Sequence, residues 1–443
     1  MLRMGCGAGF SSDRLEPAIE LAQKGRLDVL VFETIGERTM AFGHRDRKLD
    51  SRRGYNPQLG ARLRGVLPAC RHHGTRIVTN MGVANVAAAG ELTVAIAREL
   101  GLDGLQVALV EGDDVTSSIG PDTVLVDNQG KTVAEVGRPV VGANAYLGID
   151  AILPALETGA DVVITGRVAD PSLFLAPIVH RFGWATDDWP RLGQGTVVGH
   201  LMECGMQITG GYFADPGVKD VPRLADCGYP IAEVQADGAA IITKLADAGG
   251  AVTQRTVKEQ LLYEVHDPAS YLTPDVTADF STARIEDHKG DRVGVSGATG
   301  RARPGTLKVT VGFDGGWLGE AGVSYAGTNA AARARLAAQI LEERLGRHSG
   351  FAGRMRIDLV GLNALHATAH DDSRDSADVR VRVAMRAIQR DEIETMLWEV
   401  ESLLCCGPAG GGGYRGQITP SVITHSALIP REMVEPSVRV LVA

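Results

Sequence analysis

The sequence has no excess of positive charge. Its 443 residues include 45 Lys and Arg against 54 Asp and Glu, which gives a formal net charge of −9. Nucleic-acid-binding domains usually carry a basic patch or stripe, so we expect no nucleic-acid partner. The one basic run lies at 44–48, with Arg52 and Arg53 nearby. This run is typical of a solvated loop, or of a site for an anionic substrate such as a CoA phosphate.

Long apolar segments are also missing. No apolar run reaches the ~18 residues that a membrane helix needs, and the N-terminus lacks the charged region and apolar stretch of a secretory signal. The six cysteines form no C-x-x-C pair, a pattern that indicates reduced thiols rather than a disulfide framework. We therefore expect a cytoplasmic protein that has no membrane partner.

Aromatic residues are few, at 5%, whereas glycine is abundant, at 55 residues. The rest of the composition, 44% hydrophobic and 22% charged, is that of a packed globular protein rather than a disordered chain. Glycines gather in short runs at the ends of apolar segments, where tight loops need positive φ or close approach to a ligand. A chain of this length is expected to form two or three domains.

The first half alternates strand-like and helix-like segments. Continuous β-branched apolar runs occur at 27–32, 76–79, 105–110 and 161–165. Helical patterns occur at 12–25, 88–100, 149–159 and 171–182. Such runs suit a parallel sheet that is covered on both faces. We predict an α/β domain over 1–222 with a doubly wound, mostly parallel sheet, whose ligand sites follow the carboxyl ends of the strands.

The second half has a different pattern. Strands with period-two alternation are expected at 307–313, 355–360 and 379–385. A helix rich in Ala, Arg, Leu and Glu is expected at 329–345, and an amphipathic helix at 391–405. This order predicts an α+β domain over 223–443 with an open-faced, largely antiparallel sheet. A glycine-rich loop lies near 407–416.

Polar side chains follow several predicted strands of the first domain. Asn80 follows one strand and is a candidate substrate-binding residue. Arg167 follows another, where its guanidinium could hold a substrate carboxylate through two hydrogen bonds. Asp170 precedes a proline, so it is either a catalytic carboxylate or the N-cap of a helix.

Three carboxylates follow a further strand within four residues: Glu111, Asp113 and Asp114. Carboxylate oxygens are ligands for divalent cations, which makes these residues candidate metal ligands. The alternative is a capped helix start with solvent-exposed acids.

His200, Glu203 and Cys204 have the i, i+3, i+4 spacing that places side chains on one face of a helix. His200 and Glu203 could move protons or bind a metal, and Cys204 could act as a nucleophile. Together with Asp170 they are the candidate catalytic residues. The alternative is a polar cluster whose hydrogen bonds are satisfied internally.

Two glycine-rich loops are candidate anion sites. Gly7, Gly9 and Ser11 precede a predicted helix, whose first N–H groups can bind a carboxylate or phosphate. Their spacing departs from G-x-G-x-x-G and does not favour NAD, and a tight turn is the alternative. Gly411 and Gly412, with Arg415 beside them, form either a backbone nest for an anion or a simple linker.

The sequence resembles the acyclic terpene utilisation (AtuA) family, long described as a domain of unknown function. The resemblance rests on segments spread along the chain, at 7–14, 37–41, 110–114, 165–173, 203–205, 209–215, 229–233, 256–268 and 410–413. It implies bacterial catabolism of branched acyclic terpenes or similar acids, in which intermediates are often CoA thioesters. Longer relatives carry an extra C-terminal ferredoxin-like domain, which we do not expect in this chain.

These observations predict a catabolic enzyme that acts on a small carboxylate or acyl-CoA substrate by lyase, hydratase or hydrolase chemistry. We expect a homo-oligomer with a small-molecule substrate. The sequence identifies no cofactor; a CoA thioester substrate and a divalent metal are both compatible with the candidate residues. Two alternatives stay open, a non-catalytic subunit of a degradative complex and a metal-dependent hydrolase.

Overall fold

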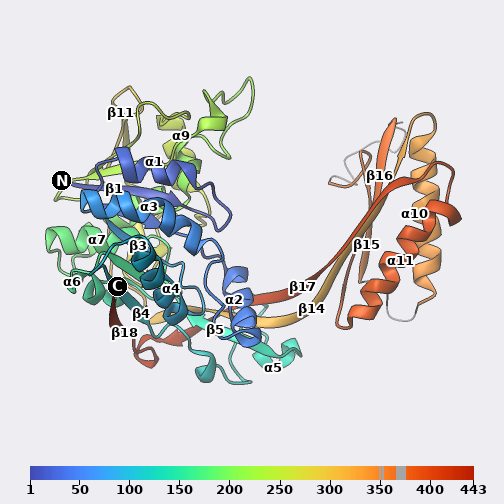
Figure 1. Cartoon of the computed structure of the whole chain (residues 1–443), viewed down its shortest axis with the longest axis horizontal. Coiled ribbons are helices and arrows are strands. Elements are labelled where there is room, and N and C mark those ends of the chain that lie inside the picture. The colour runs from blue at the N-terminus through green and yellow to red at the C-terminus, as the bar shows by residue number, and fades with distance from the viewer. Residues whose placement is uncertain (349–350, 352–353, 366–375) are drawn as a thin grey trace. The chain divides into compact units, whose positions relative to one another are not determined.

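The structure is a computed structural model, and it describes residues 1–348, 351, 354–365 and 376–443 (Figure 1). The chain divides into two compact units. Unit 1 comprises Met1–Gly312 and Thr424–Ala443, and unit 2 comprises Phe313–Ile423. The expected boundary at 222/223 lies inside unit 1, because several later segments form strands of its large sheet: 230–234, 240–244, 284–287, 293–296 and 437–442.

Unit 1 is built on a mixed sheet with a parallel centre. The parallel strands lie side by side in the order β1 (Leu2–Ala8), β2 (Val29–Phe32), β3 (Arg76–Thr79), β6 (Val162–Thr165) and β4 (Gln106–Glu111). Antiparallel strands extend the sheet beyond β1, in the order β7 (Pro230–Val234), β8 (Ala240–Lys244), β12 (Val293–Ser296) and β11 (Arg284–Asp287). The C-terminal strand β18 (Ser437–Val442) pairs antiparallel with β4.

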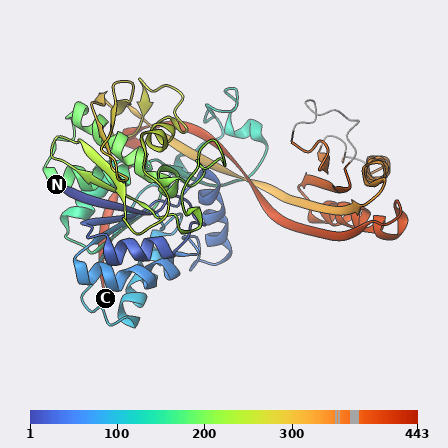
Figure 2. The same ribbon diagram turned by 90° about the horizontal axis from the view of Figure 1, so that it is seen from above.

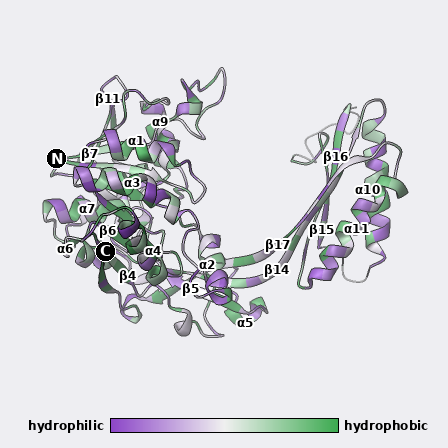
Figure 3. Ribbon diagram, in the orientation of Figure 1, coloured by the Kyte–Doolittle hydropathy of each residue, from purple (hydrophilic) through white to green (hydrophobic). Residues whose placement is uncertain are grey.

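The parallel strands are buried because they are short and almost wholly apolar. Every residue of β2 and β6 is buried. Figure 3 shows ribbon in hydrophobic green close to the label β6. The strands expected at 76–79 and 161–165 are thereby confirmed as β3 and β6. Strand β1 was not among the expected strands, because its glycines interrupt its apolar pattern.

The helices of unit 1 connect and cover these strands (Figure 2). They are α1 (Glu16–Lys24), α2 (Glu37–Leu49), α3 (Leu59–His73), α4 (Val86–Glu99), α5 (Val133–Val136), α6 (Ile149–Glu157), α7 (Ser172–Phe182), α8 (Trp189–Glu203) and α9 (Gln254–Leu262). Leu21 of α1, Leu63 of α3 and Ile96 of α4 share one apolar cluster with Leu30 of β2. Helix α7 packs against α6 and α8.

Shorter elements complete unit 1. A small antiparallel sheet contains β9 (Tyr271–Leu272), β10 (Thr277–Asp279) and β13 (Thr299–Arg301). Strand β5 (Val140–Ala145) pairs with β14 (Thr306–Ala326). Short 3-10 helices are η1 (Thr116–Ser118), η2 (Gly205–Thr209), η3 (Leu224–Asp226) and η4 (Arg431–Met433).

Unit 2 has the chain order strand, helix, strand, strand, helix, strand. Its elements are part of β14, α10 (Ala330–Gly346), β15 (Met355–Val360), β16 (Asp378–Ala387), α11 (Arg390–Cys406) and part of β17 (Gly412–Pro430). The strands lie in the order β15-β16-β14-β17, and β16 is antiparallel to both of its neighbours. This βαββαβ arrangement is the ferredoxin-like one, here inside the chain rather than as an added C-terminal domain.

One apolar cluster joins the sheet of unit 2 to its helices. Val381 and Val383 of β16 pack with Leu341 of α10 and with Ile393 and Val400 of α11. Within the described ranges, no helix combines the length and the apolar character needed to cross a membrane.

Candidate functional site

A cavity of about 670 Å³ lies in unit 1, where β6 ends. Its charged and phenolic lining includes Arg167 and Asp170, which follow β6, and Tyr146, Glu37 and Lys308. The apolar part of its wall consists of Val126, Ala169, Pro171, Leu272, Pro274, Pro304, Leu307 and Leu428. The cavity therefore combines an apolar wall with a compact charged group.

Arg167 is held in a fixed position at this site. Its guanidinium lies 3.9 Å from the centre of the Tyr146 ring, donates a hydrogen bond of 2.8 Å to the Ile35 carbonyl, and forms an ion pair of 3.0 Å with Asp170. Only 2% of the residue is exposed. Burial lowers the pKa of Arg167. The nearby Asp170, Tyr146 and Glu33 raise it by more than burial lowers it, so the pKa lies above its ordinary value. The guanidinium is therefore a permanent cation.

Glu37 and Lys308 complete the charged group around Tyr146. The Tyr146 hydroxyl donates to Glu37 Oε1 at 2.8 Å, and the Lys308 ammonium donates to the same oxygen at 3.2 Å. Lys308 Nζ lies 4.7 Å from the centre of the Tyr146 ring. Burial raises the pKa of Glu37, but Arg167, Lys308 and the Tyr146 hydroxyl outweigh this and lower it to about 2. Glu37 is therefore a carboxylate at neutral pH.

Asp170 also lines the cavity, but its electrostatic environment differs from that of Glu37. Burial raises its pKa, and the nearby Glu37 raises it further, while Arg167 opposes both effects. Pro171, rather than Asp170, is the N-cap of α7, and no side chain caps this helix. Asp170 is thus available to the cavity.

Asn80 supports a buried carboxyl group that the sequence analysis did not list as a candidate. The Asn80 amide donates to Glu33 Oε1 at 2.8 Å and accepts from the Thr34 N–H at 2.8 Å. Burial and the nearby Asp170 raise the pKa of Glu33 well above its ordinary value. Glu33 follows β2 directly, as Asn80 follows β3. The signal that could have identified Glu33 is its position one residue after a buried strand.

His200 and Glu203 form a buried pair, as their spacing predicted. His200 Nδ1 lies 2.9 Å from Glu203 Oε1, and His200 Nε2 lies 3.0 Å from the Gln260 carbonyl oxygen. Burial lowers the pKa of His200 to about 4 and raises the pKa of Glu203 well above its usual range. A neutral pair fits both directions, with the Glu203 hydroxyl donating to Nδ1 and Nε2–H donating to the carbonyl.

This pair does not line the cavity. The His200 ring instead lies 5.3 Å, centre to centre, from the rings of both Tyr271 and Phe280, and Tyr271 belongs to the cavity wall. Burial also raises the pKa of the Cys204 thiol, and the nearby Glu203 adds to the effect. Cys204 is therefore held in its protonated form, whereas a nucleophilic cysteine requires the thiolate.

The three candidate metal ligands have separate partners. Asp113 is buried and accepts from the Arg167 N–H at 2.7 Å and from the Asn144 amide at 2.8 Å. Asp114 accepts from the N–H and hydroxyl of Thr116, while Glu111 faces Arg439 of β18 at 3.5 Å. Over the described ranges, no group of three or more His, Cys, Asp or Glu residues has the arrangement of a metal site.

The polar groups of the first glycine loop form hydrogen bonds with other groups of the protein. The Gly9 N–H donates to the Asp13 carboxylate at 2.8 Å, and the Ser11 hydroxyl accepts from Asn56 at 3.1 Å. A Cβ atom on Gly7 would lie 2.5 Å from the Phe32 ring, so this glycine permits close packing. Gly7 thus lies in β1, Gly9 and Ser11 lie in the turn that follows this strand, and α1 begins only at Glu16.

Of the second expected loop, Gly411 precedes β17 while Gly412 and Arg415 lie within that strand, and all three residues belong to unit 2. The structure therefore assigns the candidate residues to two separate compact units.

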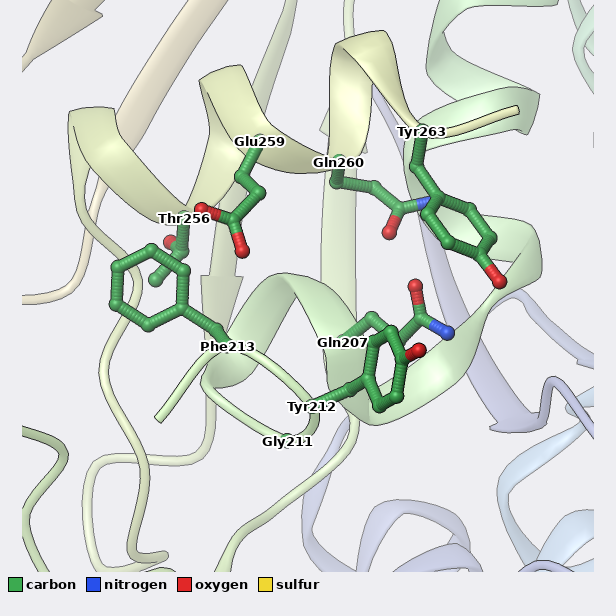
Figure 4. A pocket seen from close by; sticks show the side chains of 8 residues that line it. All are labelled: Gln207, Gly211, Tyr212, Phe213, Thr256, Glu259, Gln260 and Tyr263. Carbon is green, nitrogen blue, oxygen red and sulfur yellow. The ribbon is translucent and has the colours of Figure 1, made fainter. Parts of the chain in front are cut away.

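Unit 1 also has a small cavity of about 60 Å³ between the segment after η2 and helix α9 (Figure 4). Tyr212 and Tyr263 lie at one end of it, with Gln207 and Gln260 between the two segments.

The chain matches a known protein family over nearly its whole length. The family model described as acyclic terpene utilisation family protein AtuA matches residues 2–440. The chain belongs to the AtuA family. No curated protein matches it.

Three of the segments that carry the AtuA resemblance meet at the large cavity. Glu37 belongs to the segment 37–41, Arg167 and Asp170 to 165–173, and Glu264 and His266 to 256–268. All five residues line the cavity. Segments that are far apart in the AtuA sequence therefore contribute to one site.

Proposed function

We propose that this AtuA-family protein is an enzyme of acyclic terpene utilisation that binds a small branched carboxylic acid, or its CoA thioester, in the large cavity of unit 1. One observation supports this most strongly. Arg167 and Lys308 both lie against the Tyr146 ring, at 3.9 Å and 4.7 Å from its centre, in a cavity that also has an apolar wall.

The cavity suits a ligand with an apolar body and a polar or anionic end. Its volume of about 670 Å³ lies within the usual range for small-molecule sites, ~300–1,000 Å³. Leucine and proline side chains stabilise a branched hydrocarbon chain by excluding water from it. A guanidinium binds a carboxylate through two parallel hydrogen bonds, or polarises a thioester carbonyl through one.

Asp170 is the residue that we propose to move a proton. It lies 3.0 Å from Arg167 and lines the cavity, and burial raises its pKa. A carboxyl group whose pKa is raised toward the working pH serves as a general acid or base. Lyase, hydratase and hydrolase reactions all need such a proton transfer, so the proposal covers these three reaction types.

Glu33, His200 and Glu203 have a supporting role in this proposal. Glu33 lies behind Arg167 and raises the pKa of its guanidinium. The neutral His200–Glu203 pair packs behind Tyr271 and keeps that wall in place. A proton-transfer role for the pair would require a path past the Tyr271 ring.

The first test measures ligand binding with purified full-length protein. Thermal shifts are recorded with short branched acids, with their CoA thioesters, and with straight-chain acids of equal length. A ligand that binds only the folded state raises the melting temperature. We expect a shift with a branched acid or thioester, and its loss in Arg167→Gln.

The matched control is Arg191→Gln, which removes an exposed arginine that pairs with Asp188 on the surface. This variant is expected to keep the full shift. The proposal fails if neither branched acids nor thioesters shift the wild type, or if Arg167→Gln retains the shift. A shift with divalent metal alone would instead support a metal-dependent hydrolase.

A further inference from the structure

The sheet of unit 2 presents a row of arginines on one face. On β16, Val379, Val381 and Val383 are buried in the apolar cluster with α10 and α11. Arg380 and Arg382 alternate with these valines, so they point to the opposite, open face of the sheet. The strand thus places two cations side by side on a surface that its helices leave uncovered.

These arginines line a cavity of their own. It has a volume of about 310 Å³, and its charged lining consists of Arg380, Arg382, Arg415 and Glu320. All four residues belong to unit 2. Three cations against one carboxylate is an unusual local balance in a chain whose net charge is −9. Like charges held close together repel, and a bound anion relieves that repulsion.

Arg380 is positioned by neutral acceptors. Its guanidinium donates to the Ser324 hydroxyl and to the carbonyls of Gly322 and Gly413, each at 3.1 Å. A Cβ atom on Gly322 would lie 2.6 Å from the Val381 carbonyl and 3.0 Å from Arg380 Nε. Gly413 has φ +63°, a conformation that favours glycine. Gly322 therefore leaves room for the guanidinium and the Gly413 carbonyl accepts from it, and neither neutralises its charge.

The other two arginines differ in their pairing. Arg382 is neutralised, since it forms ion pairs of 2.5 Å with Glu320 and 2.8 Å with Asp358. Arg415 is exposed and donates to the Tyr414 carbonyl, which carries no charge. The positive charge that can bind a ligand in this cavity therefore comes from Arg380 and Arg415.

We propose that this cavity of unit 2 binds the phosphate groups of a small phosphorylated molecule, with Arg380 and Arg415 as the phosphate-binding residues. Arginine presents a planar set of donors that matches phosphate oxygens. Two cations suit a diphosphate group. The lining contains no aromatic side chain on which a base could stack, as single-stranded RNA recognition requires. A compact phosphate ligand therefore fits better than an RNA strand.

The glycine-rich segment contributes to this site through a different backbone group from the one that its sequence suggested. The backbone N–H groups of 411–412 were the expected anion donors, whereas the structure has the Gly413 carbonyl accepting from Arg380. The loop then acts by fixing an arginine side chain. The proposal is independent of the cavity in unit 1, and its test can fail while the function proposed above holds.

The test is isothermal titration of full-length protein with inorganic pyrophosphate, at low and at high ionic strength. We expect binding that weakens as salt rises. Arg415→Gln, which alters an exposed side chain, should weaken binding about tenfold or more, the effect of losing a charged hydrogen bond. Gly322→Ala should also weaken it, because the added methyl group displaces Arg380. The control is Arg386→Gln, on the same face of β16 but outside the cavity lining.

The outcomes separate the possibilities. The proposal is overturned if pyrophosphate does not bind, if Arg386→Gln weakens binding as much as Arg415→Gln, or if Arg167→Gln in unit 1 abolishes it. A parallel titration with ADP identifies the source of the phosphate. Tighter binding of ADP than of pyrophosphate supports a nucleotide, and equal binding supports a ligand recognised through its diphosphate alone.

Discussion

The guanidinium of Arg167 lies 3.9 Å from the centre of the Tyr146 ring, although the two residues come from different strand ends. Tyr146 follows β5 and Arg167 follows β6. An arginine over an aromatic face is attracted by the negative charge of that face and loses rotational freedom there. Tyr146 therefore fixes the cation that we propose to bind the substrate.

Substituting Tyr146 separates the role of the ring from that of the hydroxyl. Tyr146→Leu should weaken ligand binding by about tenfold, since Arg167 and Lys308 both lose the aromatic face. Tyr146→Phe keeps the ring and loses the two hydrogen bonds of the hydroxyl, to Glu37 and from Thr310, so a loss of about threefold is expected. Titration calorimetry with the ligand found by thermal shift measures both. Equal losses of affinity in the two variants would mean that the Tyr146 hydroxyl, and not its ring, supports ligand binding.

Asp170→Asn should abolish most of the catalysis while leaving the fold intact. Removing a general acid or base typically costs about 10²–10⁴-fold in rate, and asparagine keeps the size of the side chain. Steady-state kinetics should show the loss in kcat, with little change in KM. The control is Asp103→Asn, an exposed position. A variant at Asp170 that keeps more than about a tenth of wild-type kcat would exclude the proton-transfer role.

His200 should make the stability of the protein depend on pH. Burial lowers its pKa to about 4, against about 6.5 in an unfolded chain. Between these values the unfolded state binds a proton that the folded state does not, so this contribution to stability rises with pH and is complete above about pH 6.5.

Urea unfolding of wild type and His200→Gln at several pH values measures that contribution. The difference in unfolding free energy between the two should grow by on the order of 3 kcal/mol from pH 4 to pH 6.5, at about 1.4 kcal/mol per pKa unit. His288→Gln, at an exposed position, should show no such trend. A constant difference would show that the His200 ring is not held neutral.

Gly9→Ala should destabilise unit 1 by about 1–3 kcal/mol or more, because overpacking a tight contact forces backbone movement. A Cβ atom at Gly9 would lie 2.3 Å from the carbonyl carbon of Cys204 and 2.4 Å from the carbonyl oxygen of Glu203. Gly120→Ala is the control, since nothing lies within 4 Å of the added atom there. Thermal unfolding compares the two, and equal melting temperatures would contradict the close approach.

The sequence alone determined the central elements of the fold and part of the candidate site. Short β-branched runs such as 161–165 cannot be stable unless both faces are covered, so they identified the buried parallel strands. Residues directly after such strands lie at one edge of the sheet, and Arg167 and Asp170 line the cavity there. The i, i+3 spacing of His200 and Glu203 was enough to predict their contact, because helix geometry is local.

Only the tertiary structure decided what surrounds those residues. Tyr146 and Lys308 reach Arg167 because β5 pairs with β14, a contact between segments about 160 residues apart that no local periodicity encodes. The division into units could not be predicted from the sequence for the same reason. Strands β7, β8 and the C-terminal β18 join the sheet of unit 1 through long-range pairing. Local patterns specify which segments form strands, whereas the pairing of those strands depends on the packing of the whole chain.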